Sequence, residues 1–234
     1  MKYSNKTWRA CALCMLAALA MTTGCQNKPA ETADSTNAAT DSVVAESPLD
    51  NAVVRAIMDR RSVRKYKPEP VPKEMLDVIL HCGINAPNAM NEQRWEVRVT
   101  ESKAFIDGVT KVFIESAKDD ERVQKMVGDP DFRNMFRNAP TVIFVAGKAD
   151  EKSSPIDCGL LGENIMLAAQ SMGLGTCCLG SAAGFLKSNP GAANYLKQLA
   201  FSDGYELLYA IAIGYPDESP EAKPRDASKI RYIE

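Results

Sequence analysis

Three arginines and a serine gather within five positions of this chain, in the run Arg60-Arg61-Ser62-Val63-Arg64. A guanidinium is planar, permanently charged and able to donate two parallel hydrogen bonds, and a hydroxyl adds a short donor. This combination suits a phosphate group. The same run ends an amphipathic stretch, where cations favour the negative pole of a helix. The run therefore predicts either an anion site or a solvated basic helix end.

Two further segments carry polar or unusual residue types. The loop 86–93 holds three side-chain amides, which offer both donors and acceptors. The stretch 173–180 is rich in glycine. It does not form a dinucleotide fingerprint, because that motif needs a strand before it and a helix after it. The sequence here predicts the reverse, a helix followed by a strand.

Several kinds of catalysis are excluded by composition. His81 is the only histidine, so Ser-His-Asp and Cys-His catalysis and sites with several histidine ligands are absent. It lies beside Asp77 on the polar side of a predicted helix, and we interpret it as solvated. We predict no metal site, and no P-loop or nucleophile elbow is present. A chain without these groups suggests that a cofactor carries the chemistry.

The first 48 residues are predicted to lie outside the folded domain. Residues 1–24 combine three cations with an apolar run of about twelve residues, too short to span a bilayer core of roughly 30 Å, which indicates a secretory signal. The small residues before Cys25 resemble a bacterial lipobox, which implies lipidation of Cys25; an ordinary secretory signal is the alternative. Residues 25–48 lack aromatics and are predicted to form a flexible tether.

The folded domain is predicted to occupy residues 49–234, one domain's worth of chain. The whole chain has 28 basic and 30 acidic residues, and without the cations of the signal the balance is 25 against 30. This balance indicates no nucleic-acid partner. Four cysteines remain in the domain, too scattered for a disulfide scaffold, and we predict that they are buried free thiols. They are Cys82, Cys158, Cys177 and Cys178.

The apolar pattern predicts interleaved helices and strands, and hence an α+β domain with a small, mostly antiparallel sheet flanked by helices. Strands are predicted at 95–99, 141–145, 176–179 and 205–213. Helices are predicted with Asp50 as an N-cap, with Pro72 as a first helical residue, after Ser102, and from Asp157 to a cap at Gly173. Residues 115–138 are strongly charged and are predicted to be either a lid or a plain surface helix.

Four segments together resemble the FMN-dependent nitroreductase family, over roughly residues 50–230. The arginine run resembles the motif with which that family grips the flavin phosphate and ribityl chain. The loop 86–95 is similar to one that reaches across a dimer to the other subunit's flavin. The stretch 173–180 is similar to the backbone that lies along the isoalloxazine ring. Residues 214–216, followed by Arg225, are similar to a segment that returns a guanidinium to the phosphate.

The resemblance implies FMN as the cofactor and a homodimer with its sites between subunits. Where many family members have proline, serine and tryptophan, this chain has Arg94, Asn88 and Cys178, which puts substrate preference in doubt more than FMN binding. We interpret Cys178 as a small filler under the ring rather than a redox group. The predicted cofactor contacts are Arg60, Arg61, Ser62, Arg64, Pro87, Asn88, Ala89, Asn91, Cys178, Leu179, Gly180 and Arg225.

The resemblance also implies an oxidoreductase that takes a hydride at flavin N5 from a donor such as NAD(P)H. It would pass two electrons to a nitroaromatic, a quinone or an activated alkene. The predicted export and lipid anchoring to a bacterial cell membrane conflict with this donor, because nicotinamide cofactors are supplied in the cytoplasm. Two alternatives stay open: a reductase with a quinol or membrane redox donor, and a non-catalytic flavin-binding or partner-interaction lipoprotein. Reductive dehalogenation would need a lid with substrate contacts that the sequence does not identify.

Overall fold

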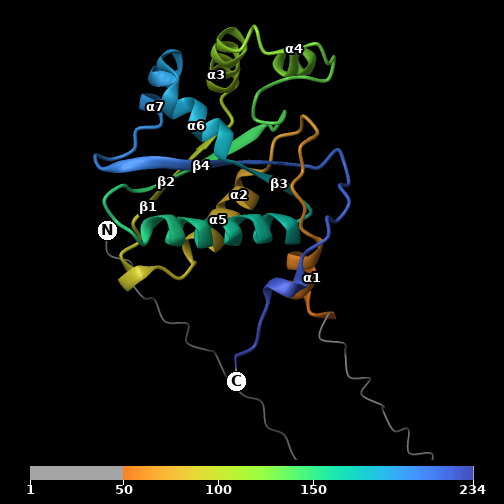
Figure 1. Ribbon diagram of the computed structural model, residues 1–234, viewed down its shortest axis with the longest axis vertical. Helices are drawn as coiled ribbons and strands as arrows, with labels where there is room; N and C mark the ends of the chain where they lie inside the picture. The colour runs from red at the N-terminus through yellow and green to blue at the C-terminus, as the bar shows by residue number, and fades with distance from the viewer. Residues whose placement is uncertain (1–49, 234) are drawn as a thin grey trace, which may run out of the picture. The chain divides into compact units, whose positions relative to one another are not determined.

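The computed structural model describes residues 50–233. The predicted signal, the lipidation site at Cys25 and the tether lie outside the described residues. Within the described range, no helix combines the length and the apolar character needed to cross a bilayer. The elements are α1 (Ala52–Asp59), α2 (Lys73–Ile84), η2 (Ala89–Asn91), β1 (Trp95–Thr100), α3 (Lys103–Ser116), α4 (Glu121–Val127), β2 (Thr141–Lys148), α5 (Ser154–Ser171), β3 (Gly175–Leu179), α6 (Gly180–Ser188), η3 (Pro190–Ala192), α7 (Ala193–Gln198), β4 (Tyr205–Gly214) and η4 (Ala227–Lys229) (Figure 1).

The four strands form one antiparallel sheet in the order β1-β2-β4-β3, which confirms the predicted α+β class. The two central strands, β2 and β4, are long apolar runs, as strands buried on both faces should be. They pair with Val142 opposite Ala212 and Phe144 opposite Ala210. The predicted central strand at 141–145 is therefore correct, and it continues three residues further.

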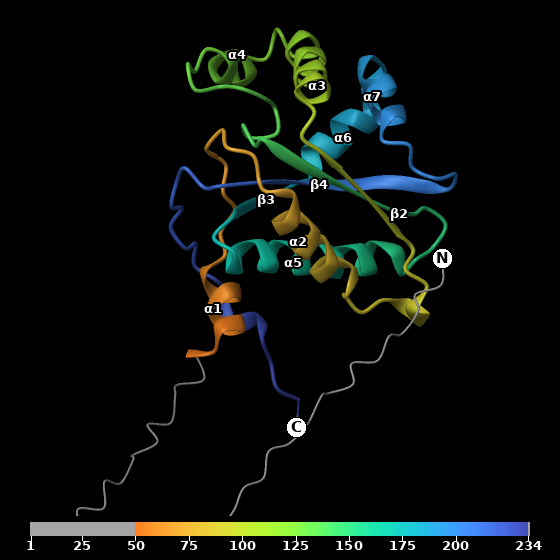
Figure 2. The same cartoon turned by 180° about the vertical axis from the view of Figure 1, so that it is seen from behind.

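Helices cover both faces of the sheet (Figures 1 and 2). Alternate residues of a strand point to opposite faces, and β2 follows this rule. Val142 and Phe144 belong to a buried cluster with residues of α3 and α6. Ile143 and Val145 belong to a second buried cluster with residues of α2 and α5. The sheet is therefore the middle layer of three.

Helix starts differ from the predictions by one to three residues. Asn51 rather than Asp50 caps α1, because the Asn51 side chain accepts a hydrogen bond from the backbone N–H of Val53 at 2.9 Å. Pro72 is the N-cap of α2 instead of its first helical residue. Helix α5 begins at Ser154, three residues before the predicted start.

Two predicted helix ends are confirmed. The Ser102 side chain accepts a hydrogen bond from the backbone N–H of Phe105 at 3.3 Å and so caps α3. Gly173 follows α5 with φ of 77°, a conformation that glycine adopts without steric cost. The next residue, Leu174, donates its backbone N–H to the carbonyl of Ala169 at 2.9 Å, which completes a Schellman-type C-cap.

The sequence patterns do not predict α6 and α7, whereas α4 lies within residues 115–138, for which a surface helix was one of the two predictions. Helix α6 starts at Gly180 directly after β3, so a strand does precede this glycine and a helix does follow it. Two glycines and two serines among its nine residues weaken the intrinsic helix signal of α6. The helix forms because it buries Ala182, Ala183 and Leu186 in the cluster that covers one face of the sheet.

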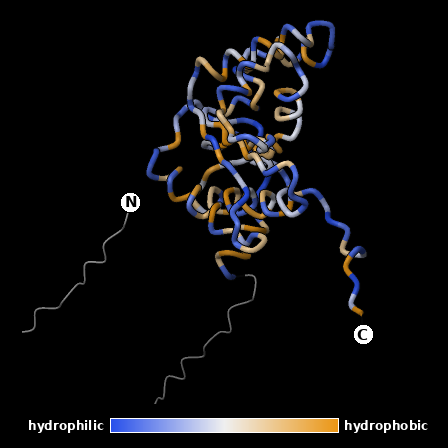
Figure 3. The backbone as a smooth tube through the Cα atoms, turned by 90° about the vertical axis from the view of Figure 1, so that its left-hand side faces the viewer, coloured by the Kyte–Doolittle hydropathy of each residue, from blue (hydrophilic) through white to orange (hydrophobic). Residues whose placement is uncertain are grey.

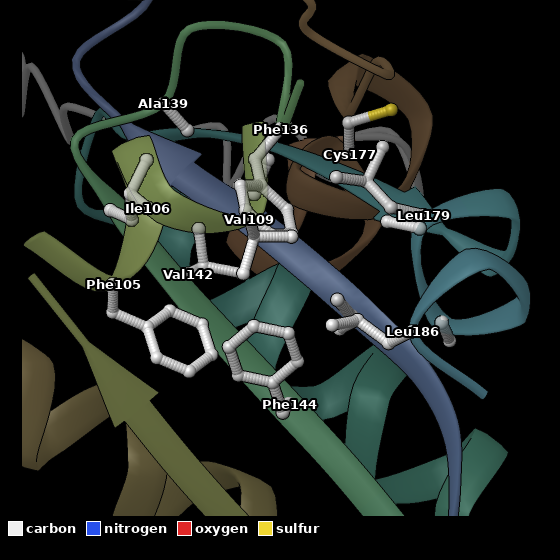
Figure 4. Packing of buried hydrophobic residues seen from close by; sticks show 14 of the residues in the cluster. Phe105, Ile106, Val109, Phe136, Ala139, Val142, Phe144, Cys177, Leu179 and Leu186 are labelled. Atoms are coloured by element: carbon white, nitrogen blue, oxygen red, sulfur yellow. The ribbon is translucent and has the colours of Figure 1, made fainter. Parts of the chain in front are cut away.

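We expect Phe144→Ala to destabilise the domain strongly. The Phe144 ring is fully buried, and it meets the rings of Phe105 and Phe136 edge to face with centroids 5.8 and 5.9 Å apart (Figure 4). Removing it leaves a cavity, with an expected loss of about 3–5 kcal/mol in the free energy of unfolding. Chemical denaturation measures this loss. Val99→Ala, at a position 38% exposed on β1, is the control and should cost far less; equal losses would contradict the three-layer packing.

Candidate functional site

The arginine run leaves α1 as extended chain and joins the edge of the sheet. Arg60 is the C-cap of α1, with ψ of 131°, so the helix ends there. Ser62 pairs in parallel with Thr176 of β3, and the backbone N–H of Val63 donates to the Thr176 carbonyl at 2.9 Å. On its other side, the chain just after the run pairs with residues 215–218. Backbone pairing with both neighbouring segments therefore fixes the backbone from which the arginine side chains extend.

Two side-chain features hold this segment against β3. A Cβ at Gly175 would lie 2.8 Å from Cβ and Cγ2 of Val63, so the close approach requires glycine. Tyr66 is buried, and its hydroxyl donates to the Val63 carbonyl at 2.7 Å. Burial raises the pKa of the Tyr66 hydroxyl far above its ordinary value, so it remains a donor at any physiological pH.

Two guanidiniums of the run contact neutral carbonyls. Nη1 of Arg61 donates to the carbonyls of Met58 at 2.6 Å and Arg60 at 2.9 Å, at the end of α1. This is the helix-end role that the sequence left open, and a cofactor contact by Arg61 stays a prediction. Arg64 is exposed, and its Nη1 donates to the Ser62 carbonyl at 3.0 Å. Arg64 is therefore free to turn towards a ligand.

Arg60 is placed differently, because its guanidinium faces α5. Its Nε lies 3.4 Å from Oε1 of Glu163, an ion-pair distance, but the geometry does not make a hydrogen bond. Among the described residues, this Nε is the one buried side-chain nitrogen or oxygen without a hydrogen-bond partner. Such atoms are rare in folded proteins and call for an explanation, such as a functional role or a water or ion that binds there.

The thiols near the run are uncharged at neutral pH. Burial raises the pKa of Cys177, and the partial desolvation of the Cys178 sulfur, together with the neighbouring Cys177, raises that of Cys178. All four cysteines of the described chain are free, as predicted, but Cys82 and Cys178 are exposed, which corrects the prediction that all are buried. Cys82 falls beside the face that α2 buries, and Cys178 is the one exposed residue of β3. A neutral, exposed Cys178 is compatible with the small filler that we predicted.

The charged segment 115–138, called the charged excursion below, lines a cavity of about 210 Å³ next to the arginine run. Arg64 and Tyr66 form one wall, and Arg133 and Arg137 of the excursion lie on another. The sequence analysis did not identify these two arginines. Arg137 has a left-handed backbone, with φ of 61°, and nothing in a sequence predicts that conformation for an arginine. The excursion is positioned as a lid would be, although closure over a ligand stays a prediction.

The loop 86–93, the amide loop, is hydrogen-bonded to the start of α5. The backbone N–H of Ala89 lies 3.2 Å from both carboxylate oxygens of Asp157, which is buried. Within the loop, Oδ1 of Asn88 accepts from the backbone N–H of Gln93 at 2.8 Å. Three loop residues have positive φ, so these contacts hold a strained conformation. They are Met90, Asn91 and Gln93.

Arg94 and Asp157 explain how the loop is held without the family's proline. Arg94 forms ion pairs with Glu92 in the loop and with Glu151, which precedes α5. Two ion pairs of Arg94 therefore hold the loop at the position where the resembled family has a proline ring. Neither Asp157 nor Glu151 was identified from the sequence, because each lies more than fifty residues from its partner and carries no local motif.

The amide loop and the arginine run contact α5 at different positions along its length. The loop contacts Asp157, the fourth residue of α5, whereas Arg60 faces Glu163, the tenth. At a rise of about 1.5 Å per residue these positions are about 9 Å apart along the axis. Figures 1 and 2 show the yellow loop near one end of α5 and the orange α1 near the other. One chain therefore holds two separate groups of predicted contacts, which we call half-sites.

The predicted contacts divide between these half-sites. One contains Arg60, Ser62, Arg64 and the segment 178–180, and the other contains residues 87–91. Arg225 belongs to neither. It is exposed, and its guanidinium donates at 3.4 Å to the carbonyl of Lys223 in its own segment. Figure 3 shows this C-terminal segment extending away from the helices and the sheet. Its predicted contact with a phosphate stays a prediction.

The donor set fits the predicted FMN better than a metal ion. Within residues 50–233, no group of three or more His, Cys, Asp or Glu side chains could hold a metal. The run instead offers the unpartnered Nε of Arg60 and the exposed guanidinium of Arg64 to an anion. Nearby, Gly180 opens α6 with free space where a Cβ would be, so a flat ring can approach the backbone there.

Comparisons with known proteins give one consistent match. A family model described as the nitroreductase family matches residues 57–215. A NADPH-flavin oxidoreductase of Vibrio harveyi is 29% identical over 185 residues, 75% of this chain and 70% of that protein. A Bacteroides fragilis nitroreductase crystallised with bound FMN has a TM-score of 0.68 and 26% identity, over 79% of this chain and 100% of that one. A Desulfitobacterium hafniense nitroreductase with bound FMN has a TM-score of 0.69 and 26% identity, over 79% and 99%.

We expect Asp157→Ala to loosen the amide loop. The substitution leaves the half-buried Ala89 N–H without its acceptor, and the loss of a hydrogen bond to a charged group costs about 1.5–3 kcal/mol. The Ala89 amide proton should then exchange with solvent at least about tenfold faster, measured by NMR hydrogen exchange. Asp77→Ala is the control, because the Asp77 carboxylate is exposed and pairs with Lys73 on α2. Unchanged exchange at Ala89 would contradict this role of Asp157.

Proposed function

The chain belongs to the nitroreductase family, and from this we infer that it is an FMN-dependent oxidoreductase. The observation that carries the inference is the unpartnered Nε of Arg60 on a segment held rigidly against β3. FMN-bound relatives with the same fold, and a flavin oxidoreductase of similar sequence, support it.

We assign the cofactor phosphate to Arg60 and Arg64. Both are permanently charged, and two guanidiniums can offset a phosphate dianion with several charge-assisted hydrogen bonds. Ser62 lies between them and adds a hydroxyl donor. The backbone from Cys178 to Gly180 would lie along the ring. When bound, FMN would supply the redox chemistry, taking a hydride at N5 from a donor and passing two electrons to an acceptor.

The protein's own charges favour that chemistry. Arg64 and Arg137 both lower the pKa of Cys177, although less than burial raises it, so both guanidiniums lie near the segment proposed to line the ring. Cations at that place stabilise negative charge as it develops. The neutral thiols of Cys177 and Cys178 add no opposing charge.

The substrates are proposed by chemical class. NADH or NADPH is the proposed donor, as the name of the Vibrio harveyi relative suggests for NADPH. The cavity beside Arg64 is lined by arginines and aspartates together with Met126 and Phe132, and we propose that a flat, electron-poor molecule enters it. A nitroaromatic, a quinone or an activated alkene meets that description.

We propose that two copies of the chain complete each site. The amide loop contacts the start of α5 and the arginine run faces its middle, and the loop of one copy would serve the run of the other. Exposed apolar side chains support such an interface, because large contiguous apolar patches are uncommon on the surface of a monomer. On α1, Val53 is 64% and Ile57 50% exposed, and on α5, Ile156 is 66% and Leu160 42% exposed.

Export and lipid anchoring also remain proposals. They depend on residues 1–24 and on Cys25, where the sequence resembles a bacterial signal and lipobox. An exported enzyme would need a reductant other than cytoplasmic NAD(P)H. A quinol or a membrane redox partner is therefore the second candidate donor.

The function is tested by adding FMN to the purified protein and mixing the complex with reductants in a stopped-flow instrument. We expect a yellow, FMN-loaded protein whose flavin absorbance bleaches with NADH or NADPH and returns with a nitroaromatic or quinone. Bleaching by a reduced quinone analogue alone would support the second donor. Bound FMN that no donor bleaches would favour a non-catalytic flavin-binding protein, and absence of FMN binding would refute the proposal.

The phosphate assignment predicts the effect of removing either arginine. Arg60→Ala and Arg64→Ala should each weaken FMN binding about 10- to 100-fold, because each removes hydrogen bonds to a charged group. Equilibrium dialysis measures the Kd. Arg55→Ala removes an exposed guanidinium from the same helix and serves as the matched control. If neither Arg60→Ala nor Arg64→Ala weakens FMN binding, the run is an ordinary basic helix end and not a phosphate site.

The proposed dimer predicts that a charge on the apolar face of α1 separates the copies and weakens FMN binding. We expect Ile57→Lys to shift the mass from dimer to monomer in light scattering after gel filtration, and to raise the Kd for FMN, because each site would lose its second half. Val99→Lys, at a 38% exposed position on the sheet's edge strand, should change neither. A monomeric wild-type protein that binds FMN tightly would refute the shared site.

A further inference from the structure

Arg60 has a carboxylate beside it in the structure, and that carboxylate belongs to none of the predicted cofactor contacts. Glu163 lies in the middle of α5 with 43% of its side chain exposed, whereas the Arg60 side chain is 24% exposed. The two atoms that approach are Nε of Arg60 and Oε1 of Glu163, at 3.4 Å. No hydrogen bond of Glu163 to any described residue accompanies this approach.

The other guanidiniums of the run have no such partner. Arg61 and Arg64 donate to backbone carbonyls, and Glu218 accepts from the backbone N–H of Arg64 rather than from its guanidinium. Arg60 is therefore the one guanidinium of the run whose charge is balanced by a carboxylate. Arg60 is also the less exposed member of that pair. Its charge is therefore less well solvated and depends more on a counter-ion.

We propose that Glu163 is an exchangeable counter-ion for Arg60: it balances the guanidinium when no phosphate is bound, and the FMN phosphate displaces it. This inference rests on the proposed function, because it concerns the same phosphate site. Glu163 would thus oppose cofactor binding, both by competing for Arg60 and by repelling an incoming dianion.

The geometry favours exchange over support. A residue that orients a binding group normally makes a well-formed hydrogen bond to it, as outer ligands of metal sites do. The N–H of Arg60 and the carboxylate of Glu163 make no such bond. A loose, half-exposed ion pair adds little stability and is easily replaced by a ligand with two negative charges and better geometry.

The charges of Arg60 and Glu163 also influence the thiol of Cys178. Arg60 lowers the pKa of Cys178 and Glu163 raises it, so both charges lie near the exposed residue of β3. That residue belongs to the segment proposed to line the ring. The pair is therefore inside the proposed cofactor site and not on a distant surface.

The test compares FMN with riboflavin, which has the same ring and no phosphate. Glu163→Gln keeps the size of the side chain and removes its charge. We expect the Kd for FMN to fall about three- to tenfold at low ionic strength and to return towards the wild-type value at high salt. The Kd for riboflavin should not change, because riboflavin does not need Arg60. Quenching of flavin fluorescence measures both constants.

Glu115→Gln is the matched control. Glu115 is an exposed carboxylate on α3 that pairs with Lys118 at 3.6 Å, so the variant makes the same chemical change outside the arginine run. It should leave both constants unchanged. Circular dichroism and thermal unfolding check that the variants stay folded, which the half-exposed position of Glu163 favours.

A second variant separates exchange at Arg60 from general repulsion. In an Arg60→Gln background, Glu163→Gln should no longer tighten FMN binding, since the guanidinium for which the two anions compete is gone. FMN affinity that is unchanged or weaker in Glu163→Gln alone would overturn the inference while leaving the proposed function intact. Persistence of the full effect without Arg60 would overturn it too. A wild-type protein that binds neither flavin would overturn both proposals.

Discussion

The site depends on one close approach, that of Val63 to Gly175. A Cβ at position 175 would lie 2.8 Å from Val63, so only glycine lets the arginine run join the edge of β3. Val63 is buried there, and its backbone pairs with Thr176. The burial of one apolar side chain in the middle of the run lets the flanking arginines stay near water while their backbone is fixed. A binding segment on a rigid edge is better oriented than one on a loop.

The charged groups of the site are each balanced in a different way. The Arg61 charge is placed at the carbonyl end of α1, a contact that serves the helix. Arg94 is held by two carboxylates and fastens the amide loop. Arg60 has a poorly oriented carboxylate partner and an N–H without an acceptor. Residues of the same type therefore have different roles, and only their partners distinguish them.

The sequence predicts what local periodicity and strong residue preferences determine. The continuous apolar run of β2 and the glycine after α5 are correct for that reason, and the arginine run was recognised because its members are neighbours in the chain. Helix α6 was missed because its stability comes from packing on the sheet. Asp157, Glu163 and Arg137 were missed because each acts on a partner more than sixty residues away, or through a backbone conformation that the sequence does not encode.

Helix α5 connects these separate findings. One of its faces packs on the sheet through Leu161 and Ile165, and this fixes the helix along the sheet's surface. Its start binds the amide loop through Asp157, and its middle faces Arg60 through Glu163. A straight helix with both contacts keeps the two half-sites of one chain apart. In the proposed dimer, a second copy would bring its loop to the first copy's arginines. The apolar side chains that α1 and α5 leave exposed are where the two copies of the proposed dimer would touch.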